Sequence, residues 1–156
     1  MATRIIFFLT LLTYAIIVSQ SFMYMLALRD VQLNLPAGPY TEVRKLIDSS
    51  MRGNFKYVIY AALLFSLLLV ILNIKTPGNL VFIAASIAFI ALVADTLLTV
   101  KGNLPINDII NAWTTDNIPA NWADYRAKWF RIFQYRQIAN ITGFVSLLVA
   151  AVFGSK

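Results

Sequence analysis

Residues 80–100 read LVFIAASIAFIALVADTLLTV, an apolar stretch with a single ionisable side chain, Asp95. A transmembrane helix needs about 20 consecutive, mainly apolar residues. Three more stretches of this kind lie at about 4–28, 57–74 and 131–153. The sequence therefore predicts an all-α membrane protein built on a bundle of four transmembrane helices.

The links between these segments predict how the helices are arranged. The turn at 75–79 is short and contains Pro77 and Gly78, so the helices on either side of it are expected to be antiparallel neighbours. The other two links are longer and fall together on the opposite side of an antiparallel bundle. In the first of them, residues 40–51 have the pattern of an amphipathic helix, which we expect to lie on the membrane surface. From Trp122 to Phe153 nothing breaks the helical pattern, so the last helix is expected to project from the membrane.

The composition favours a membrane protein over a soluble one. Hydrophobic residues make up 60% of the 156 residues, and the mean hydropathy is +0.73, whereas a soluble domain is about 45–50% apolar. The length suits a single integral membrane domain over residues 1–156. A signal peptide is the alternative for the first segment, because Arg4 precedes its apolar part, but the segment extends well beyond a signal-peptide core.

The chain contains no cysteine and no histidine. Disulfides, thiolate metal sites and histidine-ligated haem, zinc or copper are therefore excluded. We expect no metal and no cofactor, and any chemistry must use Asp, Glu, Lys, Tyr, Arg or amide groups. The net charge of +6 is assigned to contact with anionic lipid headgroups, because most basic residues flank the apolar segments and no nucleic-acid motif is present.

The basic residues are distributed unevenly across the predicted membrane. Nine of the 13 Lys and Arg residues fall on the side of the two long loops, three fall on the other side (Arg4, Lys75 and Lys156), and Arg136 lies within the last segment. The positive-inside rule then predicts cytoplasmic loops and two external termini, in an inner or plasma membrane.

Asp95 and Arg136 are the two ionisable residues inside the second pair of apolar segments. Each lies about five residues from the loop-side end of its helix, which is a depth of about 8 Å. Opposite charges at equal depth can pair, and pairing offsets much of the cost of burying either one in lipid. We therefore expect the two side chains to be in contact. The pair could serve a functional site, or it could be only a clasp that fixes the register of the helices.

Other polar side chains gather at the same level, among them Gln20, Tyr135 and Asn140, while the far half of the bundle is almost purely aliphatic. This distribution predicts a pocket at the loop-side end with apolar walls and a few convergent polar groups, which is the usual form of a small-molecule site. The alternative is that tyrosines and tryptophans near the segment ends form an interfacial belt.

The second half of the chain carries a family resemblance. Residues 103–107 read NLPIN, and Trp113, the YRAKW run at 125–129 and Tyr135-Arg136 follow before the last apolar helix. This pattern resembles the anthrone-oxygenase-like family of small four-helix membrane proteins. The resemblance implies that Asn103, Asn107, Trp129 and Arg136 are signature residues.

The resemblance also implies an activity, because fungal relatives are similar to cofactor-free oxygenases that convert an anthrone to an anthraquinone. Asp95 would be the catalytic base, and Arg136, Asn103 and Asn107 would hold the enolate oxygen. Two observations oppose this activity: some relatives have a histidine where Gln134 and Tyr135 stand here, and an Asp95 paired with arginine makes a poor base.

Two functions are therefore expected from the sequence. The first is a site for a hydrophobic small molecule such as a lipid, a quinone or an aromatic polyketide-like compound, with or without oxygenase activity. The second is a non-catalytic role as a subunit of a membrane complex or as a homo-oligomer. The predicted binding residues are Arg136, Asn103, Asn107, Trp129, Gln20, Tyr135 and Asn140. Membrane lipids are expected as partners and nucleic acids are not.

Overall fold

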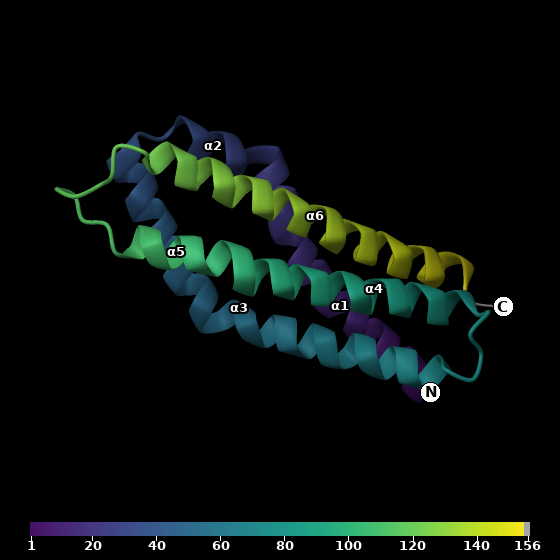
Figure 1. Ribbon diagram of the computed structural model, residues 1–156. Helices are drawn as coiled ribbons and strands as arrows, with labels where there is room; N and C mark the ends of the chain where they lie inside the picture. Colours follow the sequence, from purple (N-terminus) through teal and green to yellow (C-terminus); the bar gives the residue numbers. More distant parts are fainter. Residues whose placement is uncertain (155–156) are drawn as a thin grey trace.

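The computed structural model describes residues 1–154 of the chain (Figure 1). Lys156, which was counted for the orientation, lies outside the described residues. The helices in chain order are α1 (Ala2–Met23), the π-helical turn η1 (Tyr24–Leu28), α2 (Arg29–Asn34), α3 (Ala37–Asn73), α4 (Leu80–Leu98), the π-helical turn η2 (Thr99–Asn103), α5 (Leu104–Asn111) and α6 (Trp122–Phe153). The described chain contains no strand.

Four continuous helical stretches are long and apolar enough to cross a membrane, which confirms that part of the prediction. They are Ala2–Asn34, Ala37–Asn73, Leu80–Asn111 and Trp122–Phe153. Each is longer than the apolar segment that predicted it. For the last stretch this extension was expected, because nothing breaks the helical pattern from Trp122 onward. The 37 residues of α3 correspond to about 55 Å of helix, well beyond a hydrocarbon core of about 30 Å.

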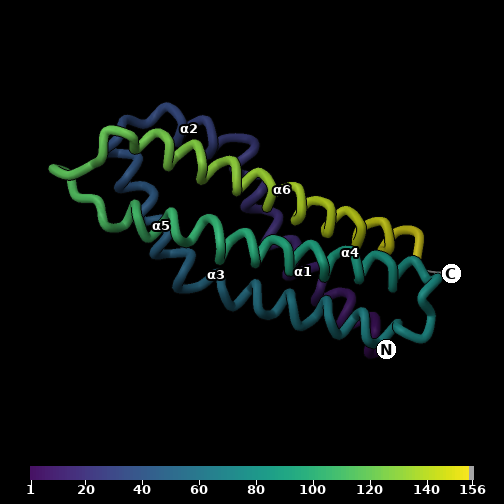
Figure 2. Tube along the Cα trace, in the orientation of Figure 1, coloured from purple at the N-terminus to yellow at the C-terminus, as the bar shows by residue number. Residues whose placement is uncertain are grey.

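The long helices lie side by side, and the two ends of the molecule differ (Figure 1). Both ends of the described chain and the short turn between α3 and α4 lie at one end, here called the closed end. The tube in Figure 2 shows that α2, α5 and the loop before α6 lie at the other end, here called the loop end. The residues between the apolar segments are thus mostly helical extensions of the bundle.

The closed end has a tightly packed core of buried side chains from all four helices, including Ile17, Leu69, Leu92 and Leu147. Tyr14 of α1 is fully buried there and its hydroxyl donates a hydrogen bond of 2.7 Å to the carbonyl oxygen of Ala88. This approach requires Gly143 of α6, because a Cβ atom at that position would lie 2.0 Å from the Tyr14 hydroxyl oxygen.

One face of α4 follows the pattern expected from the sequence. Ala84, Ala88, Ala91 and Asp95 are all buried and recur at intervals of one helical turn. Small side chains let helix backbones approach closely, and here they let α4 pack against α6, where the Ser146 hydroxyl donates to the carbonyl oxygen of Ala84.

Residues 40–51 are helical as predicted, but the prediction that they form a separate helix on the membrane surface is wrong. These residues are the first part of α3, which continues without a break through Gly53 into the apolar segment. Arg44 and Asp48 on its polar side are buried, whereas Leu46 from the expected apolar face is 69% exposed. The polar side is buried because α5 lies against it and supplies hydrogen-bonding partners.

The loop end is held together by aromatic side chains and by Arg126 of α6. The Arg126 guanidinium donates to the carbonyl oxygens of Gln32, Leu33 and Leu35 at 2.9–3.2 Å. These are the carbonyls that the end of α2 leaves without helical partners. The same guanidinium lies 4.5 Å from the ring centre of Trp122, so one side chain joins α2 to α6.

Candidate functional site

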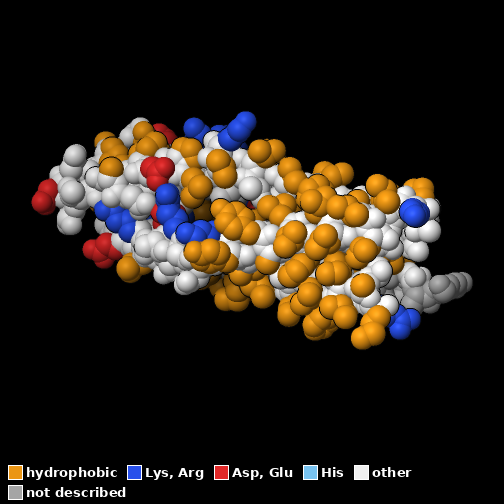
Figure 3. All heavy atoms as spheres, turned by 90° about the horizontal axis from the view of Figure 1, so that it is seen from below, with side chains coloured by type: hydrophobic (Ala, Val, Ile, Leu, Met, Phe, Trp, Pro, Cys, Tyr) orange, Lys and Arg blue, Asp and Glu red, His pale blue; other side chains and the backbone are white. Residues whose placement is uncertain are grey.

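A cavity of about 390 Å³ lies in the loop-end half of the molecule. Its walls come from α1 and η1, α3, the α4–η2–α5 stretch and α6, so all four long helical stretches contribute. Figure 3 shows basic side chains gathered toward this end of one face, beside the hydrophobic surface of the rest. Small-molecule sites occupy about 300–1,000 Å³, so the cavity is of ligand-binding size.

Asp95 and Arg136 form one side of the cavity, and the predicted contact between them is confirmed. Arg136 Nε donates to Asp95 Oδ1 at 2.7 Å. Arg136 Nη1 donates to Asn103 Oδ1 at 3.2 Å, and Asn103 Nδ2 donates to the carbonyl oxygen of Trp129. Within the described chain, Arg136 Nη2 and Asp95 Oδ2 form no hydrogen bond, which leaves one donor group and one acceptor atom for a ligand.

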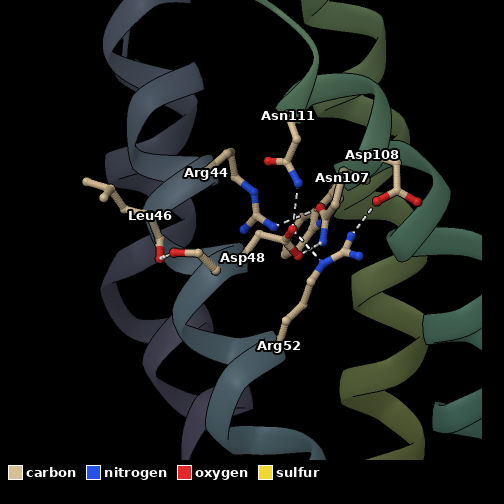
Figure 4. Close-up of polar contacts among 9 residues, drawn as sticks. Arg44, Leu46, Asp48, Arg52, Asn107, Asp108 and Asn111 are labelled. Atoms are coloured by element: carbon tan, nitrogen blue, oxygen red, sulfur yellow. Dashed lines mark hydrogen bonds and ion pairs between the residues drawn. The ribbon is translucent and has the colours of Figure 1, made fainter.

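Asn107 is the centre of a second polar cluster between α3, α5 and α6 (Figure 4). Its Oδ1 atom accepts hydrogen bonds from Arg44 Nη2 at 3.0 Å and from the Trp129 indole nitrogen at 2.8 Å. Its Nδ2 atom donates to Asp48 Oδ1 at 2.7 Å. Asn111, one helical turn further along α5, donates to the other Asp48 oxygen. Pro105 lies in the first turn of α5, directly after η2. Both amides lie on the side of α5 that contacts Asp48 of α3.

Arg52 closes this cluster on the exposed side. It forms ion pairs with Asp48 at 2.8 Å on its own helix and with Asp108 at 2.6 Å on α5 (Figure 4). Arg52 precedes the apolar segment 57–74 and lies outside it. Partial burial lowers the pKa of Arg52, but the hydrogen bonds and charges of Asp108 and Asp48 outweigh this effect, and the pKa is raised overall.

Sequence analysis missed the charged side chains of α3 that line the cavity, which are Arg44, Asp48, Arg52 and Lys56. Arg44 is the most deeply buried of them. It is 3% exposed and its guanidinium lies 3.9 Å above the ring centre of Trp129, a cation–π contact. Its Nη1 atom donates to the Tyr24 hydroxyl at 3.1 Å. The spacing of four between Arg44, Asp48 and Arg52 could have indicated one polar helix face, but it did not reveal that this face is buried.

Both π-helical turns border the cavity. Tyr24 in η1 and Thr99, Val100 and Asn103 in η2 are among its lining residues. A π-helical turn inserts an extra residue into an α-helix and changes the direction of the side chains that follow, and such turns occur frequently at functional sites. The two turns lie on different helical stretches and line the same cavity. This arrangement indicates that the region has a role beyond packing the helices together.

The structure brings six of the eight predicted site residues to the cavity: Gln20, Asp95, Asn103, Asn107, Trp129 and Arg136. Trp129 is therefore a buried wall residue and does not belong to an interfacial belt. Tyr135 and Asn140 do not line the cavity. Tyr135 is 57% exposed because it is the neighbour of Arg136 and points from another side of α6. Asn140 is buried one turn deeper than Arg136, beyond the cavity.

The chemistry of the cavity is that of a polar binding site with aromatic and aliphatic walls. Among the described residues, no group of three or more carboxylates could hold a metal ion. No family model, no curated protein and no solved structure matches this chain. The functional proposal therefore rests on the residues that line the cavity.

Proposed function

We propose that this is an integral membrane protein whose cavity binds a small, mainly apolar molecule with a hydrogen-bonding oxygen, such as a lipid, a quinone or an aromatic polyketide-like compound. The observation that carries the proposal is the convergence of Asp95, Asn103 and Arg136, together with Trp129, on one 390 Å³ cavity. The apolar walls match the ligand's hydrocarbon part, and the free Arg136 nitrogen matches its oxygen.

The proposal includes the placement of the protein in the membrane. The four helices form an antiparallel bundle in an inner or plasma membrane, with the closed end outside and the loop end in the cytoplasm, as the excess of basic residues at the loop end favours. The cavity then lies close to the cytoplasmic headgroups.

Native mass spectrometry of mildly extracted protein tests the proposal. We expect a retained small molecule that is lost in the Arg136→Gln variant and kept in Arg131→Gln, a matched control on the exposed side of α6. The double variant Asp95→Asn/Arg136→Gln removes both charges together and guards against a loss that reflects misfolding. Protein that carries no small molecule, and instead carries stoichiometric partner chains, would support the alternative role as a subunit of a membrane complex.

A second function, cofactor-free oxygenation, is favoured by Asp95 lying next to Arg136 and Asn103 in one cavity. Asp95 would take a proton from an activated CH₂ group, and the carbanion would react with O₂. Loss of water from the resulting peroxide would convert the CH₂ to C=O, so that O₂ is the oxidant and one oxygen atom leaves as water. The family resemblance to anthrone oxygenases supports this chemistry, and the ion pair with Arg136 opposes it.

Oxygen uptake with anthrone-type or quinol substrates tests the second function. Oxygenation predicts uptake by the wild-type protein that is abolished in Asp95→Asn. Equal rates in the two proteins would exclude Asp95 as the base and leave the cavity with a binding role.

A further inference from the structure

Two basic side chains of the cavity have no acidic partner. The lining includes four basic residues and two acidic ones. Arg136 is paired with Asp95, and Arg52 is paired with Asp48 and with Asp108, which lies outside the lining. Arg44 and Lys56, which also line the cavity, form no ion pair with any carboxylate of the described residues. The cavity therefore has an excess of positive charge that can be assigned to these two side chains.

Arg44 is the more informative of the two because it is buried. Its hydrogen bonds go to the neutral groups of Tyr24 and Asn107, and its charge faces the ring of Trp129. A buried charge without a counterion is costly. A ligand with an anionic group beside Arg44 would remove that cost, whereas a neutral ligand would leave it in place.

The mouth of the cavity lies near the start of the apolar segment 57–74. The exposed lining residues lie along one side, with Lys56 and Tyr60 on α3 and Val100 in η2. Lys56 is the last charged residue before the apolar segment 57–74, and the neighbouring Tyr57 is also exposed. Lysine and tyrosine are typical of the headgroup level of a membrane.

The cavity extends along α3. Its lining follows α3 from Arg44 to Tyr60, which is about 24 Å of helix. A volume of about 390 Å³ is near the lower end of the range of small-molecule sites, about 300–1,000 Å³, and therefore favours a ligand with one hydrocarbon chain over a phospholipid with two. Met51, Phe55 and Ile59 form an apolar strip along the same helix between the two ends.

We propose that the ligand is a single-chain anionic amphiphile that enters from the membrane through this mouth. Its acidic group, a carboxylate or a phosphate, is attracted by Lys56 and comes to rest beside Arg44. Its hydrocarbon chain lies along Met51, Phe55 and Ile59. This inference rests on the proposed binding function and adds to it the charge of the ligand and the route by which it enters.

The test compares a charged and a neutral probe with the same hydrocarbon chain, using the whole 156-residue chain in phosphatidylcholine nanodiscs. Laurate carries a carboxylate, whereas dodecanol has the same chain and a neutral hydroxyl. Equilibrium binding of each labelled probe, in excess of binding to empty nanodiscs, gives the two affinities. We expect laurate to bind about tenfold more tightly than dodecanol, and inorganic phosphate at millimolar concentration to leave laurate binding unchanged.

Variants locate the effect in the cavity. Lys56→Gln removes an exposed side chain without structural partners, apart from its contact with the Tyr57 ring, and should weaken laurate binding about twofold to fivefold. Lys101→Gln is the matched control, since Lys101 is an exposed lysine of η2 that does not line the cavity. Arg44→Gln should abolish the preference for laurate over dodecanol, and its melting temperature shows whether the variant folds.

Three results would overturn the inference. Equal affinity for laurate and dodecanol removes the anionic specificity but leaves the proposed binding function intact. Competition by phosphate would assign the basic groups to a soluble anion instead of a membrane amphiphile. An equal loss in Lys56→Gln and Lys101→Gln would show only general attraction between the bilayer surface and the probe. The binding function itself fails separately, when native protein retains no small molecule of any kind.

Discussion

The closed end and the loop end of the molecule are built from the same four helical stretches but use them differently. At the closed end, Tyr14 fits against Gly143 and the surrounding side chains are hydrophobic. At the loop end, Asp95, Arg136 and Arg44 are buried around a cavity. Close packing holds helices together in lipid without polar groups, so the costly charges at the loop end call for a reason other than stability.

The largest effect is expected from breaking the buried ion pair at the loop end. Asp95→Ala leaves the Arg136 guanidinium buried without its counterion and should destabilise the protein by about 3–5 kcal/mol. Thermal unfolding in detergent, compared with the wild type, measures this. A loss below about 1 kcal/mol would mean that water reaches Arg136 and takes over from the carboxylate.

The double variant Asp95→Leu/Arg136→Met separates the effect of the ion pair on stability from its effect on ligand binding. Replacing a buried ion pair by apolar side chains of similar volume is often neutral or stabilising, by about 1–4 kcal/mol. We expect normal or higher stability with loss of ligand binding. A variant that is stable and still retains its ligand would show that the pair only holds α4 against α6 and takes no part in binding.

Asn107→Ala tests the polar cluster beside the cavity. The change leaves the Trp129 indole, Asp48 and Arg44 each without one hydrogen bond. An unsatisfied buried group costs about 1–3 kcal/mol, so the free energy of unfolding should fall by about that amount. The tryptophan fluorescence of the protein should change at the same time, because Trp129 loses its hydrogen-bonding partner. Asn111→Ala, which removes only one hydrogen bond to Asp48, is the control and should cost less.

Gly143→Ala tests the close packing of the closed end. The added Cβ atom meets the Tyr14 hydroxyl, which is held in place by its bond to Ala88. Overpacking of this kind costs about 1–3 kcal/mol, while ligand binding at the other end stays unchanged. A variant as stable as the wild type would mean that Tyr14 moves aside easily and that the closed end is packed less tightly than described.

The smallest effect is expected at Gly53, and it is stabilising. This glycine lies inside α3, is exposed, and has open space around its Cα. Because glycine is about 0.8–1.0 kcal/mol less favourable than alanine in a helix interior, Gly53→Ala should raise the stability by a similar amount. A loss of stability would indicate that α3 bends at Gly53 when the protein is in a membrane.

Much of the site was predictable because buried charges in apolar segments are rare. Asp95 and Arg136 were found from their depth alone, and the cost of burying either one made their contact a firm prediction. Arg44 could not be found in this way, since it lies in a stretch where charged residues are common and are usually exposed. Tyr135 and Asn140 do not line the cavity, because depth along a helix does not specify the side that faces a cavity.

The four long apolar helices and the polar character of one end could be derived from the order of residues alone, because lipid requires continuous apolar segments with satisfied backbones. Only the tertiary structure decided that α3 is a single helix, that its polar side is buried against α5, and which side chains surround the cavity. Those features depend on contacts between residues such as Asp48 and Asn107, which lie 59 positions apart. Hydrophobic periodicity records which residues avoid water, but it contains no information about which helix covers a polar face.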